Sequence, residues 1–266
     1  DVVMLYAVPT SGWQTVRIAK RAGVPVVFRA LDVSHLIRKG LTSQLVKLAE
    51  RFVYRRATII SANNLVLGEY VTKLGGRLDS PIVNFPPLDL DHFAHRNRRQ
   101  MRINMSIDQD SFVATYMGSL FPFSGLLQVV SDFALQSESN DRLLIIGGGE
   151  IENELRKKVK ELKLEHRVIF TGVISYAELP DYLSVSDVLI NPFESTLVTN
   201  LALPHKVLQY LATGIPTVST KLSGLFASLG DAAGIYWVDS PNKIVEACLQ
   251  VKQQGVVEKL AASELG

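Results

Sequence analysis

The chain contains very little cysteine: Cys248 is the single one among 266 residues. A single cysteine excludes a disulfide framework within the chain and suits a reducing compartment, so we expect a cytoplasmic protein. No apolar run approaches the roughly 20 residues that a membrane-spanning helix needs, and no signal-peptide pattern is present. The five histidines show no metal-ligand spacing, so we expect neither a metal site nor a metal cofactor.

Charge is unevenly distributed, although the formal net charge is only +2. Residues 1–102 contain 16 Lys and Arg against 7 Asp and Glu, whereas residues 103–266 contain 12 against 19. Opposite balances indicate two domains with different partners. The basic half has no nucleic-acid-binding motif, so we expect no nucleic acid and favour an anionic lipid surface or an anionic acceptor. Ordinary solvated surface charge is the alternative.

A predicted helix at residues 41–56 carries much of this charge. Lys47, Arg51 and Arg55 recur every four residues and therefore form one stripe. We expect the inner face of the helix to contain Leu45, Leu48, Ala49 and Phe52. With these apolar residues committed to the core, the basic stripe predicts peripheral, salt-sensitive attachment at the inner face of the membrane.

The order of elements indicates two α/β domains. Strands are expected at residues 2–8, 25–30, 58–61 and 81–85, and helices at 11–22, 41–56 and from Asn63 or Asn64 onward. This alternation predicts a doubly wound, Rossmann-like domain over residues 1–86. Residues 87–110, which include a basic segment at 95–102, are expected to be a linker or crossover. Strands at 112–117, 142–146, 168–170 and 188–191 predict a second Rossmann-like domain over residues 111–266.

Residues 200–220 read as a short helix followed by a buried strand. Pro204 suits the first turn of a helix, Gly214 suits the position just past its end, and Pro216 prevents continuation. Leu203 supplies no side-chain acceptor for the first N–H groups. A helix start left open beside Lys206 is a candidate anion site. Capping of those groups by water or by a preceding polar residue is the alternative.

This stretch resembles the donor-site helix of the retaining GT-B glycosyltransferases of the family 4-like group, the glycosyl transferases group 1. A common variant there reads Asn, Pro-x-Lys, then Glu-Tyr-Leu-Ala-x-Gly-x-Pro-x-Val. The matching residues here are Asn200, Pro204, Lys206, Gln209, Tyr210, Leu211, Ala212, Gly214, Pro216 and Val218. The similarity continues in order from Asp1 to about Asp239. It implies a GT-B fold with two Rossmann-like domains.

The resemblance also implies an activity. Such a protein moves a sugar, of hexosyltransferase type, from a nucleoside-diphosphate sugar to an acceptor with retention of configuration. The nucleotide sugar is a substrate and no cofactor is needed; the expected acceptor is lipid-linked or an anionic glycan. A non-catalytic nucleotide-binding subunit, or another GT-B enzyme such as a sugar-nucleotide epimerase, is the alternative.

Part of the family pattern has no counterpart in this sequence. The family's first domain normally opens with a strand and a glycine-rich loop, so we expect an incomplete N-terminal domain and a fragment without transfer activity of its own. The C-terminal residues EKLAASELG are expected to stop inside a helical pattern.

The donor-binding residues that the resemblance implies are Gly118, Ser119, Ser124, Gly147, Gly149, Gly172, Val173, Asn200, His205, Lys206 and Gln209. Ser119 and Ser124 stand where the family usually has the Arg and Lys that grip the diphosphate. Gln209 replaces the glutamate that normally accepts hydrogen bonds from the ribose. No catalytic residue is certain; Asp32 and Glu194 are candidates, and the nearby His35 is a candidate for acceptor-side or sugar contacts.

Overall fold

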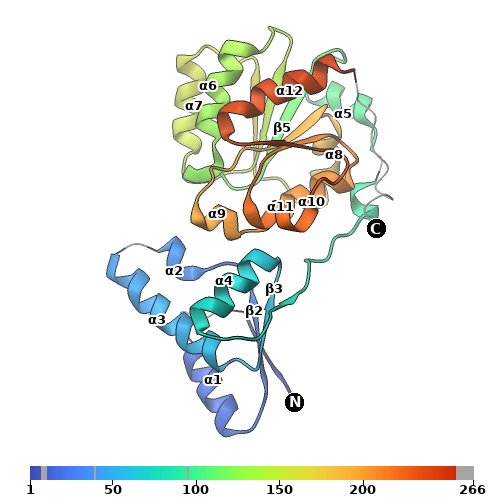
Figure 1. Ribbon diagram of the computed structural model, residues 1–266. Coiled ribbons are helices and arrows are strands. Elements are labelled where there is room, and N and C mark those ends of the chain that lie inside the picture. Colours follow the sequence, from blue (N-terminus) through green and yellow to red (C-terminus); the bar gives the residue numbers. More distant parts are fainter. Residues whose placement is uncertain (7–10, 39, 95, 256–266) are drawn as a thin grey trace. The chain divides into compact units, whose positions relative to one another are not determined.

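The computed structural model describes residues 1–6, 11–38, 40–94 and 96–255 (Figure 1). The chain divides into two compact units. Unit 1 comprises residues 1–87, 196–203 and 222–230, and unit 2 comprises residues 88–195, 204–221 and 231 onward. Each unit is built on its own parallel sheet, as the alternation of strand and helix predicted. The expected helical pattern at residues 258–266 lies outside the described residues.

Unit 1 contains a four-stranded parallel sheet in the order β1-β2-β3-β4. Its strands are β1 (Val3–Leu5), β2 (Val26–Ala30), β3 (Ile59–Ala62) and β4 (Ile82–Val83). Its helices are α1 (Gly12–Arg21), α2 (Ser34–Ile37), α3 (Gly40–Arg56), α4 (Leu65–Gly75), α9 (Leu197–Leu201) and α11 (Ser223–Leu229). Helix α3 packs between α1 and α4. Neither α9 nor α11 was predicted from the sequence.

Helix α4 begins where its sequence predicts. The Asn64 side chain accepts a hydrogen bond from the Leu67 N–H at 2.9 Å, which satisfies one of the free donors of the first turn. Gly76 ends the helix in the left-handed region, with φ 66°. The Asn64 amide also donates to the Leu201 carbonyl at 2.9 Å, and so ties α9 to α4.

Helix α3 buries a different face from the one that the sequence predicted. The expectation that Leu45 and Leu48 face the core is wrong, because they are 67% and 64% exposed. The core instead receives Val46, Val53 and Tyr54. Ala49 and Phe52, the other two residues of the expected inner face, are partly buried against that core.

A buried hydrogen bond explains the orientation of α3. Glu50, which a pattern of apolar residues places outside, is 1% exposed and lies 2.5 Å from His35 of α2. The Tyr70 hydroxyl of α4 lies 3.3 Å from the other ring nitrogen of His35. A buried carboxylate is tolerated when it is paired and hydrogen-bonded. These contacts turn the Glu50 side of α3 inward, so the leucine stripe faces outward.

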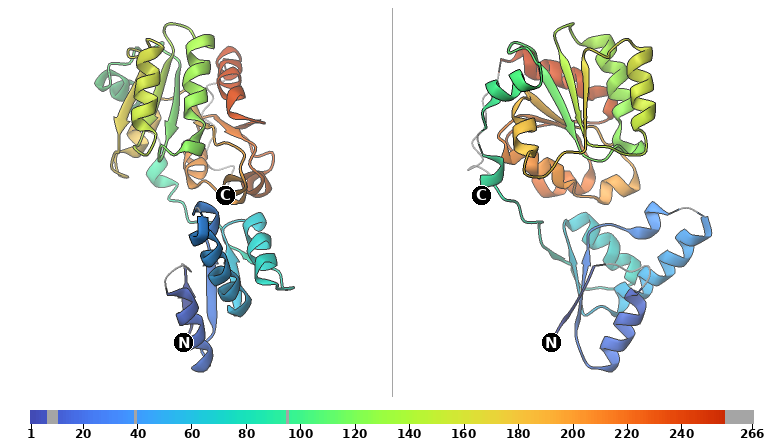
Figure 2. Two further views of the ribbon diagram at one scale, coloured as in Figure 1. Left: turned by 90° about the vertical axis from the view of Figure 1, so that its left-hand side faces the viewer. Right: turned by 180° about the vertical axis from the view of Figure 1, so that it is seen from behind.

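Unit 2 contains a six-stranded parallel sheet in the order β10-β9-β8-β5-β6-β7 (Figure 2). Its strands are β5 (Val113–Met117), β6 (Arg142–Ile146), β7 (Val168–Gly172), β8 (Val188–Asn191), β9 (Thr217–Thr220) and β10 (Ile235–Val238). Its α-helices are α5 (Arg98–Asn104), α6 (Leu126–Gln136), α7 (Glu152–Glu161), α8 (Leu179–Ser184), α10 (His205–Ala212) and α12 (Ile244–Gln253). Short 3-10 helices are η1 (Asp91–Phe93), η2 (Pro122–Ser124) and η3 (Pro241–Lys243).

Both faces of the unit 2 sheet are covered, as expected for a parallel sheet. One core joins α6, α7 and α12 to strand residues such as Leu143 and Ile145, and it contains Cys248. The other core joins α5, α8 and α10 to strand residues such as Leu144 and Ile146. Alternate residues of β6 thus serve opposite cores, so both faces of the strand read as apolar.

The basic segment at residues 95–102, expected as part of a linker, largely forms α5 within unit 2. Arg102 is fully buried and donates to the Asp187 carboxylate at 2.8 Å and to the Val185 carbonyl at 2.7 Å. Asp187 also accepts from Arg98 and, at 2.8 Å, from the Val113 N–H at the start of β5. These bonds fix α5 to the sheet and give Asp187 a structural role.

Within the described residues, no helix is long and apolar enough to cross a membrane. The same part of the chain holds no cluster of three or more His, Cys, Asp or Glu side chains suited to a metal ion.

Candidate functional site

A cavity of about 330 Å³ lies in unit 2, where three neighbouring strands end. The loops that follow β5, β6 and β7 supply most of its wall, and α10 contributes Gln209. The lining residues are Met117, Gly118, Ser119, Ile146, Gly147, Gly148, Val173, Ile174, Ser175, Tyr176, Leu179 and Gln209. Strand β5 pairs with β6 on one side and β8 on the other, so the sheet order reverses there. Open α/β sheets bind ligands in the crevice at such a switch point.

Glycine is required in this wall because backbone approaches backbone. Gly118 and Gly147 have φ angles of 134° and 128°, which side-chain-bearing residues rarely adopt. A Cβ atom on Gly147 would lie 2.2 Å from the Gly118 carbonyl oxygen, and one on Gly149 would lie 2.6 Å from the Leu120 nitrogen. The Gly147 N–H donates to the Gly172 carbonyl at 2.8 Å. The wall therefore exposes main chain to whatever occupies the cavity.

Two tyrosines position the loop after β5. The Tyr210 hydroxyl of α10 accepts from the Met117 N–H at 2.8 Å, and burial raises the pKa of this phenol well above its usual value. The Tyr116 hydroxyl donates to the Ser119 carbonyl at 2.8 Å. The Tyr210 contact joins α10 to the end of β5, and the Tyr116 contact holds the loop that follows, so the helix and the loop both contribute to the cavity wall.

Lys206 lies in the first turn of α10, a helix whose start has no side-chain cap. Its Nζ atom is buried and has no hydrogen-bond partner among the described residues. The nitrogen lies 3.9 Å from the ring centroid of Tyr116 and 4.1 Å from that of Phe193. A Cβ atom on Gly118, which lines the cavity, would be 3.1 Å from it.

The environment of Lys206 contains opposing electrostatic effects. Burial lowers the pKa of the amine well below its usual range, whereas the faces of two aromatic rings favour the charged form. No carboxylate within the described chain pairs with the amine. An anion beside Gly118 would favour the charged form of this amine, which has no competing protein partner and lies next to the N–H groups of a helix start.

The two serines that stand in place of cations differ in surroundings. Ser119 is exposed and lines the cavity. Ser124 is fully buried, and its hydroxyl oxygen has no hydrogen-bond partner in the described structure. Gly125, which follows it, has φ 69° and passes so close to the Pro192 carbonyl that a Cβ atom would lie 1.9 Å from that oxygen. The glycine frame of this loop is thus structural.

The remaining predicted donor-binding residues lie in different surroundings. Gly172 ends β7 beside the cavity with φ 70°, and Val173 lines it. His205 is the exposed first residue of α10. Asn200 belongs to unit 1, where its side-chain oxygen accepts from the Ser223 N–H at 2.8 Å at the start of α11. The place of Asn200 and His205 in a donor site remains a prediction.

The candidate catalytic residues belong to different units. Asp32 is exposed and lies in unit 1 at a small hollow lined also by Leu36 and Leu201. Glu194 is exposed and follows β8 in unit 2. His35 is only 4% exposed and is held by Glu50, so this side chain serves packing in unit 1.

Sequence reasoning missed Tyr176. It lines the cavity, and its ring stacks on His92 with centroids 4.3 Å apart. The His92 ring nitrogen Nε2 also lies 2.9 Å from the Tyr176 carbonyl oxygen. The signal available was an aromatic residue shortly after the glycine that ends a strand.

Comparison with known proteins places this arrangement in a family. Residues 111–254 match the family described as glycosyl transferases group 1. The chain is 24% identical over 214 residues to alpha-monoglucosyldiacylglycerol synthase of Streptococcus pneumoniae. The aligned region covers 76% of this chain and 47% of that protein. The chain is 25% identical over 211 residues to mannosylfructose-phosphate synthase of Agrobacterium fabrum, covering 73% of this chain and 44% of that protein. The chain thus spans about half the length of the curated relatives it matches.

Solved structures share the fold. The crystal structure of Anabaena Alr3699/HepE in complex with UDP-glucose has a TM-score of 0.80 at 17% identity, covering 98% of this chain and 71% of that one. Sucrose-phosphate synthase from Thermosynechococcus elongatus has a TM-score of 0.72 at 16% identity, covering 97% and 66%. With the family match over more than half of its length, the chain belongs to the glycosyl transferases group 1 and has the GT-B type of fold.

Proposed function

We propose that the protein transfers a sugar from a nucleoside-diphosphate sugar to an acceptor with retention of configuration, and that unit 2 binds the donor. The observation that carries the proposal is the cavity at the ends of β5, β6 and β7, with the unpaired Lys206 amine beside Gly118. Main-chain groups line a space for a nucleotide, and a cation without a protein partner is available for its phosphates. Membership of the glycosyl transferases group 1 supports the same reading.

The donor is proposed to be a UDP-sugar carrying a hexose. The Anabaena HepE structure, which shares the fold, is a complex with UDP-glucose. Gln209 lines the cavity where the family resemblance implies a ribose contact, and its amide oxygen accepts hydrogen bonds as a carboxylate does. Tyr176 at the same cavity offers an aromatic face, and base stacking on such a face is worth about 1–3 kcal/mol.

Chemistry in this proposal is electrostatic. Charge grows on the diphosphate as the bond to the sugar breaks, and Lys206 with the start of α10 stabilises that charge. Ser119 adds a hydroxyl hydrogen bond, which is weaker than the charge-assisted bond of an Arg or Lys. The leaving phosphate oxygen takes the acceptor proton, so the scheme uses no protein nucleophile.

The acceptor is proposed to be lipid-linked and to be bound by residues of unit 1. The excess of basic residues before residue 103 supports an anionic or membrane-proximal acceptor. The name of the Streptococcus pneumoniae relative describes a synthase of a glucosylated diacylglycerol. Asp32 remains the candidate for acceptor or sugar contacts on this unit.

Nucleotide binding by the 266-residue chain tests the proposal. Thermal unfolding is measured with UDP, UDP-glucose, UDP-galactose, ADP, GDP and inorganic pyrophosphate. A ligand at about 100 times its Kd adds about 2.7 kcal/mol to the stability of the state that binds it, so the preferred nucleotide raises the unfolding temperature clearly. We expect a uridine nucleotide to do so more than the others. Stabilisation by none of them would refute donor binding by unit 2.

A non-catalytic nucleotide-binding subunit is the second candidate. The replacement of both family cations by Ser119 and Ser124, and of a glutamate by Gln209, favours it. Assay of the complete protein with the preferred UDP-sugar distinguishes the two functions. Sugar transfer to a membrane lipid extract supports the enzyme; tight nucleotide binding without transfer or donor hydrolysis supports the binding subunit.

A further inference from the structure

Helix α3 carries an exposed apolar stripe on the side away from its core. Leu41, Leu45 and Leu48 are 85%, 67% and 64% exposed. Their spacing of four and three residues places them on one face of the helix, and Phe52 continues the line. The Arg56 guanidinium lies 3.7 Å from the centre of the Phe52 ring and covers it. The more regular apolar face of α3 therefore faces outward, which is unusual for a helix of a lone globular unit.

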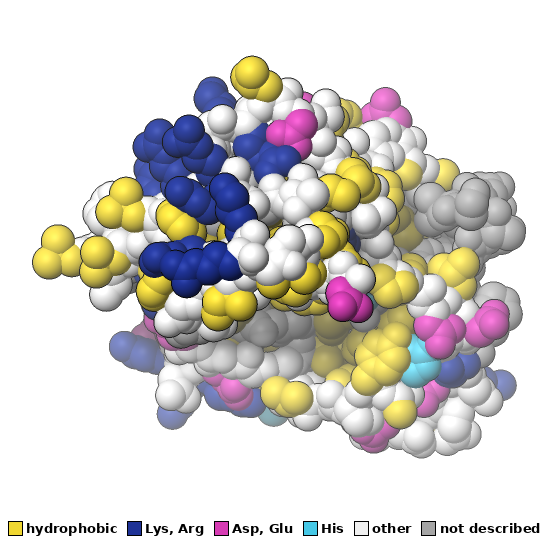
Figure 3. Space-filling view, turned by 90° about the horizontal axis from the view of Figure 1, so that it is seen from below, with side chains coloured by type: hydrophobic (Ala, Val, Ile, Leu, Met, Phe, Trp, Pro, Cys, Tyr) yellow, Lys and Arg dark blue, Asp and Glu magenta, His cyan; other side chains and the backbone are white. Residues whose placement is uncertain are grey.

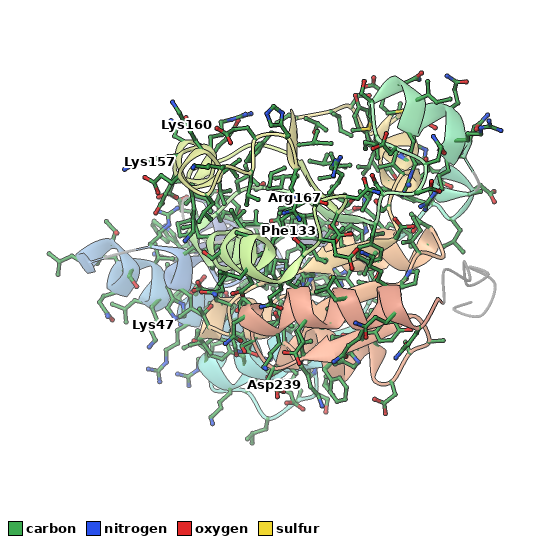
Figure 4. All side chains as sticks on the ribbon, turned by 90° about the horizontal axis from the view of Figure 1, so that it is seen from above. Lys47, Phe133, Lys157, Lys160, Arg167 and Asp239 are labelled. Atoms are coloured by element: carbon green, nitrogen blue, oxygen red, sulfur yellow. The ribbon has the colours of Figure 1, made fainter. Side chains whose placement is uncertain are left out.

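A row of cations flanks this stripe. Lys47, Arg51 and Arg55 are exposed and recur every four residues beside the leucines. Within the described residues none of the three forms an ion pair. Figure 3 shows Lys and Arg side chains gathered next to hydrophobic ones on this side of the molecule, and Figure 4 shows Lys47 pointing away from the ribbon.

Acidic side chains are missing from the exposed side of α3. Glu50 is the one acidic residue of the helix, and its carboxylate is buried against His35. The exposed side of this helix thus combines leucine with positive charge. That combination is typical of helices that lie in the plane of an anionic membrane surface, where apolar residues enter the acyl boundary and cations meet the headgroups.

We infer that α3 is an interfacial membrane helix, with Leu41, Leu45 and Leu48 inserted among the lipids and the cation row held at anionic headgroups. The positive charge favours a lipid surface over a second copy of the chain as the partner of this face. Two copies joined through it would bring their cation rows together, and these would repel each other. The interface lies in unit 1 and is independent of the donor cavity of unit 2. The charge distribution alone predicts attachment at the membrane surface, and the exposed leucines add insertion of apolar side chains into the bilayer.

Vesicle sedimentation with the full chain tests the inference. We expect binding to vesicles rich in phosphatidylglycerol, weaker binding at high salt because charges are screened, and little binding to phosphatidylcholine. The variant Leu45→Ser/Leu48→Ser should lower partitioning at least about tenfold, since it removes the apolar area that enters the bilayer. The variant Lys47→Gln/Arg51→Gln/Arg55→Gln should lower it about a hundredfold at low salt.

Matched controls change the same residue types on α6 and α7 of unit 2. Leu135, 83% exposed, is changed to Ser, and the exposed Lys157 and Lys160 are changed to Gln. These variants should bind vesicles as the unchanged chain does. The altered side chains are all exposed, so we expect the unfolding temperature of each variant to equal that of the unchanged chain. This measurement also checks that each variant is folded.

Fluorescence distinguishes insertion from surface attachment. A Leu48→Trp variant should shift its emission to shorter wavelength on anionic vesicles, relative to the unchanged chain with Trp13 and Trp237, whereas Leu135→Trp should not. Three results would overturn the inference: no binding to anionic vesicles at low salt, full binding by the double serine variant, or no shift from Leu48→Trp. A dimer in solution that the serine variant dissociates would assign the stripe to a second copy instead.

Discussion

The main chain at Gly147 presses against Gly118, so closely that a Cβ atom on Gly147 would lie 2.2 Å from the Gly118 carbonyl oxygen. Gly147 also holds φ 128° and donates its N–H to the Gly172 carbonyl at 2.8 Å. Three strand-end segments therefore meet here through backbone atoms. A side chain at this point would separate the loops, and the cavity wall would lose its shape.

Gly147→Ala should damage both stability and ligand binding. The strained backbone conformation alone costs about 1–3 kcal/mol for a residue with a side chain, and the clash with Gly118 adds to it. Gly148→Ala is the matched control for stability, since a Cβ atom there would meet Val173 and Glu152 at an ordinary 3.4 Å. Chemical denaturation and calorimetry with UDP measure the two effects. Equal behaviour of the two variants would contradict the importance of the contact.

Removal of the Lys206 amine should weaken nucleoside-diphosphate binding. Lys206→Met keeps the aliphatic packing between Tyr116 and Phe193 but removes the charge. We expect a loss of about 1.5–3 kcal/mol, the usual range for hydrogen bonds to charged groups, with Lys157→Met on the exposed side of α7 as the control. Titration calorimetry with UDP gives the answer. An affinity unchanged in Lys206→Met would remove this residue from the site.

Nucleotide binding should be coupled to proton uptake at Lys206. Burial lowers the pKa of this amine in the free protein, and a bound diphosphate raises it again because it favours the charged form. Between the two pKa values the amine gains a proton on binding. Affinity should therefore be highest below the lowered pKa of the free protein, should fall as pH rises from that pKa to the pKa of the complex, and should level off above it.

Calorimetry in buffers of different ionisation enthalpy measures this uptake. The titrations are repeated at increasing pH from about 7.5 upward. This range lies above the pKa of the terminal phosphate, about 6, so the ligand itself does not take up or release protons. The uptake should disappear in Lys206→Met. Uptake of the same size in that variant would assign the proton to another group.

The buried pair between Arg102 and Asp187 should be essential to the stability of unit 2. Asp187→Ala leaves a fully buried guanidinium with carbonyl partners only, and breaking a buried pair from one side costs about 3–5 kcal/mol. Glu161→Ala, which breaks an exposed pair with Lys157, should cost less than about 1 kcal/mol. Denaturant unfolding compares the two. A small effect of Asp187→Ala would show that α5 is held by its apolar contacts instead.

The sequence predicted the parallel strands and the donor helix well, because both depend on signals from residues close together in the chain. Pro204 and Gly214 bracket α10 as expected, and Asn64 caps α4. It failed on α3, where two faces carry apolar residues and the choice depends on tertiary contacts. The buried partner of Glu50 is His35, 15 residues away, and no helical period reveals such a pair.

Other features of the site also depended on distant contacts. The Tyr210 hydroxyl meets Met117, 93 residues earlier in the chain, and the Lys206 amine lies between rings from two other segments. Helices α9 and α11 have five and seven residues and pack in unit 1 with segments far away in sequence. Short helices of this kind carry too few residues for a periodic pattern to be visible.

The burial of Cys248, the single thiol of the chain, allows local opening of unit 2 to be measured by the rate of thiol labelling. Cys248 packs on α12 in the core of unit 2, and burial raises the pKa of the thiol, so the reactive thiolate is scarce in the closed state. A thiol reagent can modify the protein only when α12 lifts from the sheet. The labelling rate then reports the free energy of that opening, and any nucleotide that binds the closed form must slow it.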